Sequence, residues 1–163
     1  MDDKSTWRAG LKSPDVGLRA AAAERLCQAG SDASDAAVEL VQACADDEAV
    51  SNWAAAALEG LGAPPLSAVE PLQKLLSSSN SLEAYWAATL LGRLGLDAQT
   101  SEKHLAKVLT SSKDVAVQER AAWALGEIGA TSDDALKALS NAAGGGDTRL
   151  ARLARSALSA SAQ

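Results

Sequence analysis

The sequence has no phenylalanine, one tyrosine and four tryptophans, and its β-branched residues are few. Strands depend on aromatic and β-branched side chains, so this composition leaves little from which to build a sheet. Alanine and leucine, which are good helix formers, occur along the whole chain. The composition therefore predicts an all-α protein, and 163 residues suffice for one domain with a substantial core.

Basic residues are also in deficit, with 15 lysines and arginines against 21 aspartates and glutamates. The resulting net charge of −6 opposes binding to nucleic acid or to an anionic membrane surface. No apolar run approaches the ~20 residues of a membrane span, and the first residues lack the basic and apolar segments of a signal peptide. We therefore expect a cytoplasmic protein that binds neither nucleic acid nor membrane.

Residues that commonly catalyse reactions or bind metals are sparse. The two cysteines, Cys27 and Cys44, form no Cys-x-x-Cys pair and no metal-ligand cluster with the single histidine, His104. The glycine run 144–146 lacks the lysine and Ser/Thr of a phosphate-binding loop, and no nucleophile elbow or dinucleotide fingerprint is present. We expect no catalytic residue, no metal and no cofactor, and two buried thiols.

The sequence does contain an internal repeat. Leucines recur at 26, 58, 91, 125 and 158, spaced by 32, 33, 34 and 33 residues, and each follows an alanine by four residues. An Asp or Asn that suits a helix N-cap lies eleven residues before each leucine, and a Gly that suits a helix C-terminus lies four residues after the first four. These residues are Asp15, Asp47, Asn80, Asp114 and Asp147, with Gly30, Gly62, Gly95 and Gly129. Each copy therefore predicts one complete helix, here named the B helix.

A second amphipathic segment, here named the A helix, precedes each B helix. These segments cover about 5–11, 35–45, 68–76, 101–109 and 133–143, with apolar residues at helical spacing. The repeating unit is therefore a helical hairpin. Five hairpins are predicted, at about 1–30, 31–62, 63–95, 96–129 and 130–160, within a single domain over 1–163.

One A-helix segment and one B-helix segment carry a family resemblance. The runs Ala-Val-Glu-Pro-Leu-Gln-Lys-Leu-Leu (68–76) and Ala-Ala-Trp-Ala-Leu-Gly-Glu-Ile-Gly (121–129) resemble the A and B helices of HEAT-like repeats, in the short variety named after phycobilisome lyases. The resemblance extends over nearly the whole chain. It implies an α-solenoid, a right-handed superhelix of about five hairpins, whose B helices line a concave surface that usually binds another protein.

Helical phase divides each B helix into a core side and an outer side. Counted from the capping residue as zero, positions +3, +7, +10, +11 and +14 are mostly apolar and predict the core. In the fourth copy these are Val117, Ala121, Ala124, Leu125 and Ile128. Position +8 is alanine in four copies, which allows close stacking, but is Arg155 in the fifth. Together with Arg149 and Arg152 it predicts a solvated end of the solenoid, with a functional basic patch as the alternative.

Positions +2, +5, +6, +9 and +13 point away from the core and are expected on the concave surface. Four of the five aromatic residues fall there, and polar residues form the expected rim. The predicted site comprises Trp53, Tyr85, Trp86 and Trp123, with Asn52, Arg93, Glu119, Arg120 and Glu127. Large aromatics dominate interface energetics, so this set predicts a site for a protein or peptide. Position +6 lies only ~80° from the apolar centre, so Trp53 and Trp86 are either displayed or packed between helices.

HEAT-like proteins have other functions besides protein binding. A bilin lyase or lyase-accessory role is what the family name implies, and an aromatic surface suits a tetrapyrrole edge as well as a peptide. HEAT-like DNA glycosylases line a cleft with Trp, Asp and Arg, but this chain is acidic. HEAT-like iron hydroxylases acting on deoxyhypusine carry repeated His-Glu pairs, which the single histidine excludes. We predict a non-enzymatic protein-interaction scaffold, with a monomer as the default.

Overall fold

All five predicted hairpins are present in the computed structural model, which describes residues 3–162. The A helices are α1 (Asp3–Gly10), α3 (Ala37–Ala43), α5 (Val69–Leu75), α7 (Glu102–Ser111) and α9 (Asp133–Ala143). The B helices are α2 (Val16–Ala29), α4 (Glu48–Gly60), α6 (Ser81–Arg93), α8 (Val115–Glu127) and α10 (Thr148–Ser161). The all-α repeat fold is thus confirmed. Residues 1, 2 and 163 of the predicted domain lie outside the described residues.

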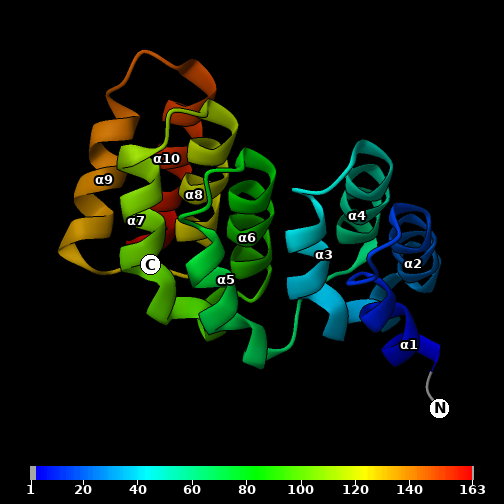
Figure 1. The fold of residues 1–163 in the computed structure, drawn as a ribbon. Helices are drawn as coiled ribbons and strands as arrows, with labels where there is room; N and C mark the ends of the chain where they lie inside the picture. Colours follow the sequence, from blue (N-terminus) through cyan, green and yellow to red (C-terminus); the bar gives the residue numbers. More distant parts are fainter. Residues whose placement is uncertain (1–2, 163) are drawn as a thin grey trace. The chain divides into compact units, whose positions relative to one another are not determined.

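The chain divides into two compact units, Met1–Ala68 and Val69–Gln163. In the first unit α2 packs against α4, while α1 contacts α2 and α3 contacts α4. In the second unit α8 packs against both α6 and α10, and α7 packs against α9 (Figure 1). Each unit therefore stacks hairpins with A helices in one layer and B helices in the other. The single domain and the handedness of the superhelix stay predictions.

Local sequence sets the ends of the B helices, as expected. The N-cap side chains of Asp15, Asp47, Asn80, Asp114 and Asp147 all accept hydrogen bonds from backbone N–H groups of the first helical turn. Past the helix ends, Gly30, Gly62, Gly95 and Gly129 have φ angles of 57°, 78°, 57° and 65°. Residues with a Cβ rarely adopt these left-handed conformations, which is why glycine recurs there.

The repeated leucines and alanines form the core, also as expected. Leu26, Leu58, Leu91 and Leu125 are 0% exposed, and Leu158 of the last hairpin is half-buried. The alanines four residues before them are buried, and their small side chains bring neighbouring backbones close together. Complete burial of a leucine contributes ~1.5–3 kcal/mol, so the repeated buried leucines are a major source of stability.

Some local features differ from expectation. The connections Gly30–Ala36 and Gly95–Ser101 contain 3₁₀ turns, so α3 begins two residues later than predicted. Its first N–H, at Ala37, donates to the carbonyl of Ser34 in the tighter 3₁₀ pattern. Cys44 is buried as expected, but Cys27 is only half-buried.

A buried carboxylate joins two hairpins of the second unit. Glu102, the first residue of α7, is 7% exposed, and its Oε2 accepts hydrogen bonds from the backbone N–H groups of Thr131 and Ser132 at 3.1 and 2.8 Å. Burial acts to raise the pKa of Glu102, but the hydrogen bonds from Ser132 and Thr131 together outweigh it and lower this pKa below 4.5. The ionised carboxylate therefore satisfies donors at the start of α9.

Two leucines of the same helix provide a test of the core. Leu26→Ala in α2 removes a fully buried side chain and should lower the free energy of unfolding by ~2–5 kcal/mol. Leu18→Ala, at a position 61% exposed in the same helix, should change it by less than ~0.5 kcal/mol. Denaturant unfolding followed by circular dichroism measures both. Equal losses would contradict the assignment of the core side.

The carboxylate of Glu102 should make a pH-dependent contribution to the free energy of unfolding. Because its pKa is lower in the folded state, its stabilisation is complete above its ordinary value of 4.5 and is lost as the pH falls through the folded pKa. We expect Glu102→Gln to lower the free energy of unfolding by ~1–2 kcal/mol at neutral pH.

The destabilisation by Glu102→Gln should shrink as the pH falls below 4.5 and through the lowered pKa of the folded state, where the wild-type carboxyl group also becomes neutral. Urea unfolding at several pH values measures this convergence. Glu127→Gln, at an exposed carboxylate, is the matched control and should stay near wild type throughout. A Glu102→Gln deficit that persists unchanged in acid would contradict the assignment.

Candidate functional site

Five of the predicted site residues meet on neighbouring B helices of the second unit. Tyr85, Trp86 and Arg93 come from α6, while Arg120 and Trp123 come from α8. We name these five residues the aromatic–arginine row. Aromatic rings and guanidinium groups alternate along much of it, an arrangement that favours cation–π contacts.

The contacts within the row are continuous. The Arg120 Cζ atom lies 4.8 Å from the centroid of the Tyr85 ring and 5.6 Å from that of Trp123. The Tyr85 and Trp86 rings meet edge to face, with centroids 5.4 Å apart and planes at 86°. The Arg93 Cζ atom lies 5.8 Å from the centroid of the Trp86 ring. Arg120 is thus held between aromatic rings from two helices.

Gly92 of α6 makes room for Trp123. A Cβ atom at Gly92 would lie 2.4 Å from Cζ3 of the Trp123 ring, so the indole occupies the space that a side chain at position 92 would need. The same repeat position in α8 is Gly126, where a Cβ would lie 3.1 Å from Cα of Ala157 in α10. Sequence reasoning missed Gly92. A signal was present, because glycine inside a helix costs about 1 kcal/mol relative to alanine and needs a packing reason.

The row is only partly accessible. Trp86 is 6% exposed, whereas Tyr85, Arg93, Arg120 and Trp123 are each half-buried. Of the two alternatives for Trp86, the structure shows the buried one, so its ring is not available to a partner in this conformation. The accessible part of the row is therefore formed by Tyr85, Arg120 and Trp123, with Arg93 beside Trp86.

The other predicted site residues lie apart from these contacts. Glu119 forms an ion pair with Arg149 of α10 at 3.3 Å, and Glu127 is exposed. Asn52 and Trp53 belong to the first unit, on α4, and both are exposed, Trp53 to 39%. For Trp53 the structure thus shows the displayed alternative.

A small cavity adjoins the row between α8 and α10. Its volume is about 80 Å³, and its lining comprises Trp123, Gly126, Glu127, Leu153, Ser156, Ala157 and Ala160. Most of these residues are apolar or small. The indole of Trp123 thus contacts Arg120 of the row and also borders an apolar hollow.

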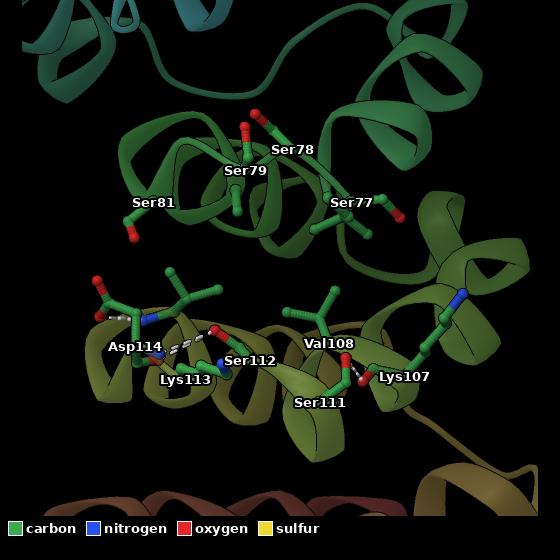
Figure 2. A pocket seen from close by; sticks show the side chains of 13 residues that line it. Ser77, Ser78, Ser79, Ser81, Lys107, Val108, Ser111, Ser112, Lys113 and Asp114 are labelled. Carbon is green, nitrogen blue, oxygen red and sulfur yellow. Dashed lines mark hydrogen bonds between the residues drawn. The ribbon is translucent and has the colours of Figure 1, made fainter.

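A larger cavity of about 610 Å³ lies near the N-terminal ends of α6 and α8 and the C-terminal ends of α5 and α7 (Figure 2). Figure 2 shows Ser77 to Ser81 on one side and Lys107 to Asp114 on the other. Several of its polar groups already serve the helix ends. Ser78 donates to Glu83, the backbone N–H of Asp114 donates to Ser112 Oγ, and Asp114 Oδ1 caps α8. This cavity is therefore best described as a junction between helix caps.

Exposed arginines occupy the last helix of the second unit, which fits both a solvated end and a basic patch. Arg149, Arg152 and Arg155 of α10 are exposed. The Nη2 atom of Arg155 donates to the carbonyl of Ala143 at 2.9 Å, which satisfies an acceptor at the C-terminus of α9. The residues described in the structure include no group of three or more His, Cys, Asp or Glu side chains that could hold a metal ion. They likewise include no helix that is long and apolar enough to cross a membrane.

Comparison with known families agrees with the helical repeats. The model of HEAT repeats matches residues 69–159. The chain belongs to the HEAT-repeat family. This match covers the unit that contains the aromatic–arginine row, so the row lies on B helices of HEAT repeats. No curated protein sequence matches the chain.

Several solved structures share the fold. An engineered protein is 27% identical with a TM-score of 0.68, and the match covers 99% of this chain and 80% of that one. In the complex of CpcE and CpcF of phycocyanin lyase from Nostoc sp. PCC7120, a chain is 26% identical with a TM-score of 0.67, over 97% of this chain and 64% of that chain. Human deoxyhypusine hydroxylase, at 16% identity and a TM-score of 0.54 over 98% of this chain and 73% of that one, is similar in fold alone.

The close contact at Gly92 can be tested with matched glycines. Gly92→Ala should displace the Trp123 ring, since overpacking of ~1–3 kcal/mol exceeds or offsets the gain in helix propensity. Gly60→Ala in α4 adds a methyl group to open space and should stabilise by up to about 1 kcal/mol.

Indole N–H resonances in nuclear magnetic resonance spectra report the environment of Trp123, and thermal unfolding reports stability. The Trp123 resonance should move in Gly92→Ala and stay unchanged in Gly60→Ala. An unmoved resonance together with a gain in stability in Gly92→Ala would contradict the contact.

Proposed function

We infer that this protein is a non-enzymatic interaction module that binds a protein or peptide segment on the B-helix side of its second unit. The observation that carries this proposal is the group Tyr85, Arg120 and Trp123, held together by cation–π contacts and still partly accessible. Tyrosine, tryptophan and arginine are the residue types most enriched at the energetic centres of protein interfaces.

The arrangement also favours binding because it is already formed. Trp123 is fixed by its contact with Gly92, and Arg120 by its two rings. Side chains held before binding lose little conformational entropy when a partner arrives. The adjoining cavity of about 80 Å³ would receive a small apolar side chain of the partner. Glu127 at its edge would contribute to a polar rim.

The comparisons support a binding role without identifying the partner. The similar chain from Nostoc is part of a complex of two proteins, and another similar chain above 25% identity is an engineered protein. Net charge of −6 argues against nucleic acid as the partner, since such binding relies on many cationic contacts to phosphates.

A bilin lyase or lyase-accessory role is the second candidate, favoured by the 26% identity to a chain of the phycocyanin lyase complex. The shared segment covers 64% of that chain, so the activity of the complex is not carried over with the fold. Mixing the protein with a free bilin distinguishes the candidates. A shift in bilin absorbance that Trp123→Ala removes would favour the lyase-related role.

Peptide selection provides the main test. Short random peptides displayed on phage and selected on the purified full chain should yield binders whose affinity falls by about tenfold or more in Tyr85→Ala and Trp123→Ala, as truncation at an interface centre does. Both variants should remain folded, because neither side chain belongs to the leucine core, and circular dichroism verifies this before affinity is compared.

Val115→Ala is the matched control, since Val115 is an exposed apolar side chain on the same helix as Trp123, outside the row. It should leave affinity unchanged. Trp53→Ala tests the exposed aromatic of the first unit separately. Binding that depends on Trp53 but not on Tyr85 or Trp123 would move the site to the first unit and contradict the proposal.

A further inference from the structure

Arg120 is half-buried and has no hydrogen-bond acceptor in the structure. Its guanidinium lies between the Tyr85 and Trp123 rings, and within residues 3–162 it forms neither a hydrogen bond nor an ion pair. Arg19 of the first unit, also half-buried, instead donates to both carboxylate oxygens of Asp46 at 2.6 and 2.8 Å. The N–H donors of Arg120 are therefore unused.

Acidic residues of α6 and α8 do not neutralise Arg120. Glu119 contacts Arg149 of α10 at 3.3 Å instead. Glu83 of α6 accepts a hydrogen bond from Ser78, and the carboxylate of Glu127 forms no ion pair in the described part of the chain. The charge of Arg120 thus remains available to a group from another molecule.

The ring contacts of Arg120 suit one kind of ligand. The Tyr85 and Trp123 ring centroids lie 4.8 and 5.6 Å from its Cζ atom, and a planar guanidinium directs its N–H groups outward along its own edge. A carboxylate placed at that edge accepts two parallel hydrogen bonds, which are stronger than hydrogen bonds between neutral groups. Partial burial among aromatic rings lowers the local screening by water and strengthens the pair further.

The distribution of charge favours a single carboxylate over a polyanion. The first unit has five lysines and arginines against eleven aspartates and glutamates, whereas the second unit has ten of each. The unit that contains Arg120 therefore has no net charge to repel one acidic side chain. A nucleic acid would need several cations along its backbone, which an unbiased surface does not supply.

We propose that Arg120 is the receptor for an aspartate or glutamate side chain of the protein segment that binds the aromatic–arginine row. This assignment rests on the proposed function, and it adds the chemistry of the partner. The carboxylate lies against the guanidinium edge, while a small apolar side chain of the same segment enters the cavity beside Trp123.

The carboxylate site is tested directly with small probes on the ¹⁵N-labelled full chain. N-acetyl-glutamic acid α-amide carries a side-chain carboxylate, and N-acetyl-glutamine α-amide is its neutral match. The first should shift the Nε–Hε resonance of Arg120 and the indole resonance of Trp123 in a saturable way, and the second should not. Equal shifts with both probes overturn the assignment.

Variants complete this test. Arg120→Gln should remove the Trp123 response to the acidic probe, and Arg120→Lys should keep only part of it, because an ammonium cannot form the paired hydrogen bonds. Arg25→Gln, at an exposed arginine of α2, is the control and should respond as wild type does. An undiminished response in Arg120→Gln overturns the assignment. Circular dichroism verifies that each variant is folded.

Selected peptides provide the second test. Changing the acidic residue of a binder to its amide should weaken binding to wild type by about tenfold or more, and change binding to Arg120→Gln by less than about twofold. Amidated peptide C-termini exclude a terminal carboxylate. Binders without any acidic residue overturn the carboxylate assignment but leave the proposed function intact.

The two proposals therefore fail separately. An acidic probe that shifts the Arg120 resonance supports the carboxylate site even if peptide selection yields no binders. A selection without binders would remove the proposed function. An oligonucleotide that binds wild type and loses affinity in Arg120→Gln overturns the assignment to an acidic protein segment.

Discussion

Close approach of neighbouring B helices is the constraint on which the rest of the structure depends. Buried alanines recur one helical turn before the core leucines, and Gly126 lacks a Cβ atom where the backbone of α10 approaches α8. Gly92 lacks a Cβ atom where the Trp123 ring of α8 lies against α6, so close packing makes room for a large side chain where a neighbouring one is absent. Trp86 is also buried, and it contacts the half-buried side chains of Tyr85 and Arg93. The contacts of the aromatic–arginine row are thus a consequence of how tightly the hairpins stack.

Two charged side chains of the second unit, Glu102 and Arg120, differ in how their hydrogen-bonding groups are satisfied. Glu102 is buried, and its carboxylate accepts hydrogen bonds from two backbone donors at the start of α9. A buried charge that accepts hydrogen bonds in this way contributes to the connection between hairpins. Arg120 lies close to the Tyr85 and Trp123 rings and has no hydrogen-bond acceptor among residues 3–162. The first charge is satisfied within the fold, and the second is the one to which we assign a carboxylate of a partner.

Features governed by neighbours in sequence were predictable, and features governed by the register between helices were not. The caps at Asp114 and Gly129 and the buried Leu125 follow from local chemistry and a fixed period. Helical phase also identified the members of the row. For Trp86, helical phase predicted only the direction in which the side chain points. Whether the side chain is buried depends on which residues of the neighbouring helix lie over it. The contact between Gly92 and Trp123 joins residues 31 positions apart and depends on how α6 and α8 align.

Divergence between copies of the repeat explains how such a fold acquires a specific surface. Position +6 is Trp53, Trp86 and Arg120 in three successive copies, while the capping and core positions around it stay nearly constant. The constant positions hold each helix in register, so the side chain at +6 differs between copies while the leucine core is kept: Trp53 is exposed, Trp86 is buried and Arg120 is half-buried. An arginine that replaces a tryptophan in this register meets the rings of Tyr85 and Trp123. The shared fold thus positions these groups, and the residues that differ between copies determine what the surface can bind.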